Sequence, residues 1–199
     1  MKNNTLRIVI LVIALGCLIL GYYYYLSHRG TTTDKNEATT QTTEMQKVLE
    51  KDFTKEYPET PRSVIKWYNR IIALYYNEDT TDSDVEALCD QAMMLMDADL
   101  LQVNPRDTYI TNVKADIADY AQHERKIMTM EVCSTADVEY KTIDNRDYAY
   151  VLVYYFLKEG SNFQKTYQKY ALRKDDGGKW KIIAMELTDA NGDPVSNTN

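Results

Sequence analysis

The sequence predicts an α+β protein in which about three helices come first and pack on an antiparallel sheet of four to five strands. Two observations lead to this fold class. After Lys126 the spacing of apolar residues changes from about 3.6 residues, the period of a helix, to 2 residues, the period of a strand. The segments between the later apolar runs are short and rich in turn-forming residues, which is typical of hairpins.

The first helix of the domain is predicted to begin at Thr60 and Pro61 and to end near Asn77. Threonine is a favoured N-cap residue, and proline is tolerated in the first helical turn because its missing N–H group would have no partner there. Residues at steps of three and four then form one wide apolar face: Val64, Trp67, Tyr68, Ile71, Ile72 and Tyr75.

Further helices are predicted on both sides of this one. Ser83 opens a second helix with a methionine-rich apolar face, and Asn104 with Pro105 opens a third. Upstream, apolar residues at helical spacing predict a short helix within residues 44–55: Met45, Val48, Leu49 and Phe53.

Five strands are predicted after Lys126. They span Ile127–Cys133, Val138–Ile143, Tyr148–Lys158, Phe163–Arg173 and Lys179–Leu187. The joints between the last four are only a few residues long, and a parallel return needs a crossover of a dozen or more residues. These consecutive strands are therefore expected to be antiparallel.

The third predicted strand is apolar on both faces. One face carries Tyr148, Tyr150, Leu152, Tyr154 and Phe156, and the other carries Ala149, Val151, Val153, Tyr155 and Leu157. Both faces are therefore expected to be covered, one by the helices and the other by sheet curvature, another subunit or a partner.

The N-terminal region predicts a membrane anchor. Residues 8–26 contain no charge and, as a helix, reach about 28 Å, close to the thickness of the hydrocarbon layer. Tyr22–Tyr25 stand where an aromatic belt is expected, and Lys2 with Arg7 favours a cytoplasmic N-terminus. Two alternatives stay open, a cleaved signal peptide and a lipoprotein acylated at Cys17.

The rest of the chain divides by composition. Thr31–Thr43 is threonine-rich and lacks large apolar residues, so it predicts a tether. The predicted organisation is a cytoplasmic tail at residues 1–7, a transmembrane anchor at 8–26, a polar linker with a possible short helix at 27–55, an extracytoplasmic α+β domain at 56–189 and a disordered C-terminal tail at 190–199. The predicted location is the cell membrane, crossed once.

Charge and cysteine content narrow the functional classes. The formal net charge of −7 opposes binding to nucleic acid or to an anionic lipid surface, since both require a basic face. Cys89 and Cys133 fall in a predicted helix and a predicted strand, and an extracytoplasmic location permits either a disulfide between them or two free buried thiols.

Several stretches carry a resemblance to known proteins. The order of helices and strands, with Lys179-Trp180-Lys181-Ile182-Ile183 as the last strand, resembles the cone-shaped nuclear transport factor 2-like fold. Thr60-Pro61, Trp67-Tyr68-Asn69, Tyr154-Tyr155-Phe156 and Leu172-Arg173-Lys174-Asp175 are similar to a family of uncharacterised, membrane-anchored proteins of Gram-positive bacteria. The resemblance covers residues 60–188 and the anchor, and it implies a curved sheet around helices with a pocket at the open end.

The resemblance also indicates where chemistry would lie, because enzymes of this fold place a carboxylate and a tyrosine in an apolar cavity. Glu131 and Glu186 are the candidate acids. The alternative without a catalytic role is that both side chains lie in solvent at strand ends. The candidate pocket residues are Trp67, Tyr68, Tyr75, Tyr150, Tyr154 and Trp180. No metal-binding, phosphate-binding or nucleophile motif is present in the sequence, so no cofactor or metal is expected.

The function predicted from the sequence is that of a membrane-tethered extracytoplasmic binding or interaction module. Its partner is expected to be an envelope protein, a second copy bound through the sheet, or a small apolar ligand. The alternative is a small isomerase or hydrolase that uses a buried glutamate and a tyrosine.

Overall fold

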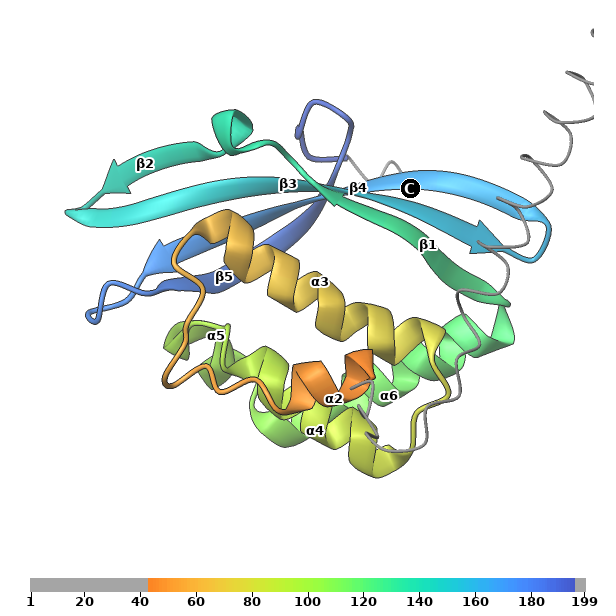
Figure 1. The fold of residues 1–199 in the computed structure, drawn as a ribbon. Helices are drawn as coiled ribbons and strands as arrows, with labels where there is room; N and C mark the ends of the chain where they lie inside the picture. The colour runs from red at the N-terminus through yellow and green to blue at the C-terminus, as the bar shows by residue number, and fades with distance from the viewer. Residues whose placement is uncertain (1–42, 196–199) are drawn as a thin grey trace, which may run out of the picture. The chain divides into compact units, whose positions relative to one another are not determined.

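The structure of the chain, a computed structural model, describes residues 43–195. Within this range five α-helices precede a five-stranded antiparallel sheet, so the predicted α+β order is confirmed (Figure 1). The anchor predicted for residues 8–26 lies outside the described residues. None of the helices in the described range is both long and apolar enough to cross a bilayer.

The helices that the sequence predicts begin at or within two residues of their predicted starts. The described helices are α2 (Glu44–Leu49), α3 (Pro61–Asn77), α4 (Asp82–Met93), α5 (Ala98–Val103) and α6 (Arg106–Gln122). The Thr60 side chain accepts a hydrogen bond from the Ser63 N–H, and Thr81 caps α4 in the same way through Asp84. The short helix predicted within residues 44–55 is present as α2, and α5, which has only six residues, is the helix that the sequence did not predict.

The folded unit extends beyond both boundaries drawn from the sequence. Val48 and Phe53 are buried in the core, so the residues of α2 and its following loop pack as part of the domain rather than as a linker. At the other end, Pro194 bridges to Thr188, and Gly192 is buried beside Lys169. Residues 190–195 therefore pack on the domain instead of forming a disordered tail.

The sheet contains β1 (Arg125–Val132), β2 (Glu139–Ile143), β3 (Arg146–Glu159), β4 (Asn162–Lys174) and β5 (Trp180–Thr188). The order is β1-β3-β4-β5, and β2 pairs with the first part of β3 along the same edge as β1. Asp144 and Asn145 have positive φ angles in the tight turn between β2 and β3, as residues of a type I′ turn require. The predicted strands and their antiparallel pairing are confirmed.

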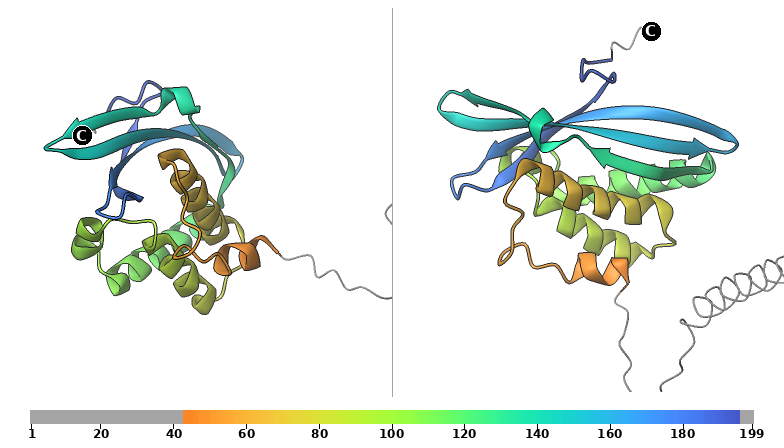
Figure 2. Two further views of the ribbon diagram at one scale, coloured as in Figure 1. Left: turned by 60° about the vertical axis from the view of Figure 1, so that its left-hand side comes forward. Right: turned by 45° about the horizontal axis from the view of Figure 1, so that its top comes forward.

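The sheet bends over α3, which lies along its concave side (Figure 2). Two side chains fix α3 to the edge strand β1. Arg62 Nε donates to the Cys133 carbonyl at 2.7 Å, and Asn77 exchanges two hydrogen bonds with the Ile127 backbone, at 2.7 and 3.0 Å. The core lies between the helices and this concave face.

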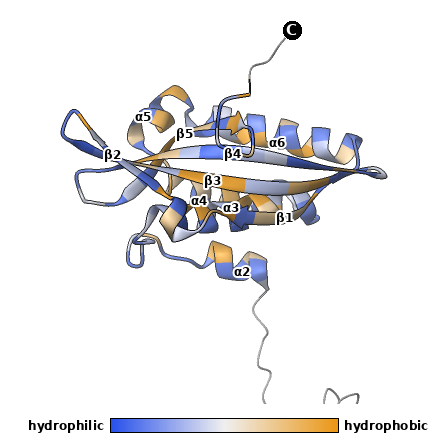
Figure 3. Ribbon diagram, turned by 90° about the horizontal axis from the view of Figure 1, so that it is seen from above, coloured by the Kyte–Doolittle hydropathy of each residue, from blue (hydrophilic) through white to orange (hydrophobic). Residues whose placement is uncertain are grey.

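The two faces of β3 have different environments. Ala149, Val151, Val153, Tyr155 and Leu157 are buried against the helices, whereas the intervening residues are only half-buried on the opposite face. Figure 3 views the sheet from that opposite, outer side, with the apolar length of β3 at its middle. The two apolar faces predicted for this strand are therefore one core face and one outer face that stays partly open.

Candidate functional site

A cavity of about 410 Å³ lies between α3 and α6 on one side and the concave face of the sheet on the other. This volume falls within the usual range of small-molecule sites, roughly 300 to 1,000 Å³. We call it the tyrosine cavity. Its lining residues are Tyr68, Ile72, Tyr75, Tyr76, Asn104, Tyr109, Asn112, Val113, Asp116, Tyr120, Ile127, Tyr155, Leu157, Thr166, Gln168, Tyr170, Met185 and Leu187.

The periodicity of each element brings these side chains together. On α3 and α6 the lining residues recur at steps of three and four, so they share one helical face. On β3, Tyr155 and Leu157 are two residues apart and point to the same side, and Tyr170 reaches the cavity from β4. The cavity therefore depends on the same alternation that builds the core.

A chain of polar contacts crosses the sheet side of the cavity. Tyr155 Oη lies 3.1 Å from Asn69 Oδ1 and 2.7 Å from Tyr170 Oη, which lies 2.8 Å from Gln168 Oε1. Three contacts share two hydroxyl protons, so one of the two side-chain amides must donate instead of accept. The network therefore orders the two tyrosines and fixes the orientation of an amide at one of its ends.

Five buried side-chain polar atoms have no hydrogen-bond partner among the described residues, and two of them belong to residues at or beside the cavity. They are the Tyr75 hydroxyl, on a residue that is 1% exposed, and Asn69 Nδ2. If the Asn69 amide is rotated so that its oxygen and nitrogen exchange places, Nδ2 donates a hydrogen bond to the Tyr155 hydroxyl. The Tyr75 side chain is among those that line the cavity, while its hydroxyl is buried near Cys89 and Tyr109.

Among the described residues, Asp116 is the one ionisable carboxyl in the lining, which contains no lysine or arginine. Burial raises the pKa of Tyr68, Tyr75, Tyr109 and Tyr170 above the ordinary value of 10.0. These phenols therefore remain protonated at neutral pH. They present apolar rings with hydroxyl groups, which suits an uncharged ligand that has a ring and one or two polar atoms.

Asp116 on α6 is the acidic residue of the cavity lining. Burial, and secondarily the charge of Asp119, raises the pKa of the Asp116 carboxyl above 3.8. At the edge of the cavity, the rings of Tyr76 and Tyr120 stack with centroids 4.1 Å apart. Asp116 is an exposed residue and the two rings are half-buried, so its carboxyl lies on the solvent side of the lining, where partial desolvation favours the neutral form.

Two of the six pocket residues predicted from the sequence line the cavity, Tyr68 and Tyr75. Tyr150 and Tyr154 instead lie on the outer face of the sheet, because β3 turns its other set of residues toward the helices. Trp180 begins β5, where its ring contacts Tyr140. These three residues are absent from the cavity lining.

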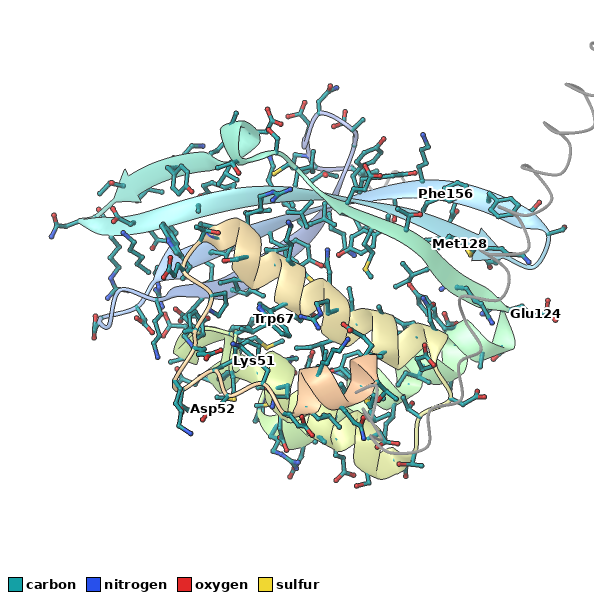
Figure 4. The ribbon with its side chains drawn as sticks, viewed as in Figure 1. Lys51, Asp52, Trp67, Glu124, Met128 and Phe156 are labelled. Carbon is teal, nitrogen blue, oxygen red and sulfur yellow. The ribbon has the colours of Figure 1, made fainter. Side chains whose placement is uncertain are left out.

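Trp67 also lies away from the cavity. Its ring meets Phe53 edge-on at 5.5 Å, and the Arg70 guanidinium covers it at 3.9 Å. Figure 4 shows Trp67 near Lys51, where α3 faces the segment after α2. The apolar face of α3 is wide enough to serve two layers, so helical spacing alone did not separate its cavity side from its α2 side.

The predicted acids do not reach the cavity either. Glu131 and Glu186 are exposed, and neither lines the cavity. This agrees with the alternative that both side chains lie in solvent. Cys89 and Cys133 are free thiols, Cys89 buried and Cys133 half-buried. In the part of the chain that the structure describes, no group of three or more His, Cys, Asp or Glu side chains is arranged to hold a metal ion.

Sequence reasoning missed Tyr155, Tyr170 and Asp116. The signal for Tyr155 was present, because it shares strand parity with Ala149 and Val151, a purely aliphatic set typical of a core face. The position of Asp116 was harder to find, because its helix is mostly polar and places only three residues in the core.

A larger hollow of about 660 Å³ lies where α5 meets the β4–β5 hairpin. Its walls are mostly charged, and several of these charges are already paired, as Arg173 is with Asp97 and Asp99. The tyrosine cavity is lined by buried rings and has Asp116 as the one charged side chain of its described lining, so it is the better candidate site.

Comparison with known proteins gives one result on identity. No curated protein matches the chain. One family model matches residues 1–185, that of DUF6715, described as a domain of unknown function. This match spans nearly the whole chain, so the protein belongs to the DUF6715 family.

Proposed function

We propose that this protein is a membrane-tethered binding module whose tyrosine cavity holds a small, uncharged, ring-containing ligand. The observation that carries the proposal is a cavity of ligand size whose lining is rich in tyrosines with protonated hydroxyl groups. The rings of the lining would pack on a ring of the ligand, and their hydroxyl groups would donate to a ligand oxygen.

We further propose that the domain has the nuclear transport factor 2-like fold. Helices against the concave side of a curved antiparallel sheet, with a cavity between the two layers, support this assignment. The shared fold alone does not select a function, since folds of this kind host unrelated activities. The functional proposal therefore rests on the cavity.

Membrane tethering is proposed from the apolar segment at residues 8–26. The test is extraction of cell membranes with alkaline carbonate, which removes peripheral proteins. The full chain should stay in the pellet, and its C-terminal domain should be cleaved by protease added outside intact cells. Release by carbonate, or protection of the domain, would contradict this part of the proposal.

Ligand binding is tested with three uncharged probes of increasing size: phenol, 2-naphthol and 4-phenylphenol. The full chain in lipid nanodiscs is titrated by fluorescence against empty nanodiscs. We expect saturable binding by the unmodified protein and loss of binding by Asn112→Trp, which fills the cavity from an exposed position of α6. Ala118→Trp, on the same helix but outside the lining, should bind as the unmodified protein does.

Failure of all three probes, or equal binding by the two tryptophan variants, would reject the cavity as the binding site. The matched pair separates occlusion of the cavity from a general effect of an added ring on α6. Both substitutions replace exposed residues, so neither is expected to prevent folding.

Asp116 favours a second candidate function, a small isomerase or hydrolase. Its carboxyl lines the cavity and has a raised pKa, as a general acid at an apolar site requires. The test is chromatography of two uncharged probes after long incubation with the full chain: 2-naphthyl acetate, whose ester can be hydrolysed, and cyclohex-3-enone, whose double bond can move into conjugation. Conversion that Asp116→Asn abolishes, with probe affinity unchanged, would identify an enzyme, and recovery of unchanged probe would favour the binding module.

A further inference from the structure

The outer face of the sheet carries a compact group of rings and lysines near the β3–β4 hairpin. Three consecutive cross-strand pairs form it: Tyr154 with Tyr167, Phe156 with Lys165, and Lys158 with Phe163. Partners directly opposite each other in an antiparallel pair point to the same side of the sheet. We call these six residues the aromatic–lysine patch, and Figure 4 marks Phe156 within it.

The rings of the patch pack on one another, three of them half-buried and Phe163 exposed. Phe156 and Phe163 stack with centroids 5.5 Å apart and planes at 11°, and Tyr154 lies 5.7 Å from Tyr167. Phe163 is 57% exposed. Large apolar side chains grouped on an open surface mark a site of interaction.

The charge of the patch is positive although the chain is acidic. Lys158 and Lys165 form no ion pair with another described residue, and neither does Lys126, which pairs with Lys158 across β1 and β3. Lys165 Nζ lies 5.4 Å from the centre of the Tyr154 ring. Glu131, opposite Tyr154, is the acidic residue on this face of the paired segments.

We propose that the aromatic–lysine patch docks the domain on an anionic lipid surface. Rings inserted at headgroup level combined with ammonium groups that pair with lipid phosphates are the features of interfacial membrane binding. The net charge of the whole chain opposes this partner, but attraction at a bilayer depends on the charges within a Debye length of it. Near the patch these are Lys126, Lys158 and Lys165 against Glu131.

Other occupants fit these residues less well. Lysine is depleted at the cores of protein–protein interfaces, whereas here lysines alternate with the rings. A second copy stacked face to face on the patch would bring the same lysines together. The inference uses neither the tyrosine cavity nor the proposed anchor, so it stands or fails independently of the proposed function.

The three phenylalanines of the chain provide an internal control. Phe156 and Phe163 lie in the patch, and Phe53 is 1% exposed in the core. The full chain, labelled throughout with 4-fluorophenylalanine, is added to vesicles of equal parts phosphatidylcholine and phosphatidylglycerol. The ¹⁹F resonances are assigned with single Phe→Leu variants, and a lipid carrying a nitroxide near its headgroup is then introduced.

We expect the nitroxide lipid to broaden the Phe156 and Phe163 resonances and to leave the Phe53 resonance sharp. The broadening should fall in vesicles of phosphatidylcholine alone. It should also fall in the Lys158→Glu/Lys165→Glu variant, but not in Lys47→Glu/Lys66→Glu, a matched pair of exposed lysines on α2 and α3.

Three results would overturn the proposal. The patch resonances could broaden no more than that of Phe53, or the two double variants could lose broadening equally, which would indicate a general charge effect. The patch resonances could instead respond to the number of protein copies per vesicle and not to the nitroxide lipid. That last result would make the outer face an interface between copies of the chain.

Discussion

Arg173 on β4 holds Asp97, the N-cap residue of α5, through hydrogen bonds from Nε to Oδ2 at 3.2 Å and from Nη2 to Oδ1. The side chains are only 14% and 4% exposed. Beside them, the Asp97 N–H donates to the Ile182 carbonyl at 2.8 Å. This ion pair therefore fastens the segment between α4 and α5 to the sheet.

Removing one partner of this buried pair should be costly. We expect Arg173→Met to lower the free energy of unfolding by about 3 kcal/mol, because it leaves the Asp97 carboxylate buried without its cation. The adjacent Lys174→Met is the control, since its pair with Asp147 lies at the surface and should leave stability nearly unchanged. Chemical denaturation of both variants measures the difference, and equal losses would show that the Arg173 pair is no stronger than a surface one.

The polar network of the cavity makes a second prediction. Tyr155→Phe removes the hydroxyl shared by Asn69 and Tyr170, and we expect a loss of about 1 to 3 kcal/mol from the buried groups left unpaired. Tyr154→Phe changes the neighbouring residue on the outer face, where the hydroxyl makes no hydrogen bond to another described residue. Urea denaturation should show little effect of that control, and a similar loss in both would mean that the network contributes nothing specific.

The raised pKa of the Asp116 carboxyl leads us to expect that the stability of the protein depends on pH. Because the pKa of its carboxyl is raised in the folded protein, ionisation costs folding free energy, and this cost develops as pH rises from 3.8 through the folded pKa. Asp116→Asn should therefore melt at a higher temperature than the unmodified protein at pH 7. The two melting temperatures should converge below pH 3.8, and a difference that persists or grows in acid would contradict the raised pKa.

The burial of Phe53 predicts that the segment after α2 is required for folding. Phe53→Ala should lower the free energy of unfolding by about 3 to 5 kcal/mol, as expected for a large side chain removed from a core. Lys55→Ala, two residues later and 82% exposed in its side chain, is the control and should be neutral. If Phe53→Ala left the free energy of unfolding unchanged, the segment after α2 would be a linker and not part of the folded domain.

The sequence was sufficient for features that depend on local chemistry. The cap at Thr60 with Pro61 located the start of α3, and the turn residues located each hairpin, because these signals lie within a few neighbouring positions. The tyrosine cavity depends on which face of β3 meets the helices. Both faces are apolar, so this choice was decided by tertiary packing and placed Tyr155, not Tyr154, inside.

The prediction that Glu131 or Glu186 is a buried acid was wrong for a related reason. Glu131 and Glu186 were chosen by shared strand parity with apolar residues, but they point to the outer face of a sheet that the helices cover only on its concave side. Asp116 reaches the cavity from α6, a helix whose position is set by its packing on α3 and α4. Contacts of this kind cannot be read from spacing along one element.

The bridge between Met96 and Ile182 joins residues far apart in the chain. Synthesis proceeds from the N-terminus, so every helix leaves the ribosome before the strand that completes this bridge. Until β5 emerges, the apolar side of α3 has no complete sheet to cover it. A nascent chain halted before Trp180 would therefore expose apolar surface of α3. Folding of the domain cannot be completed until β5 has been synthesised.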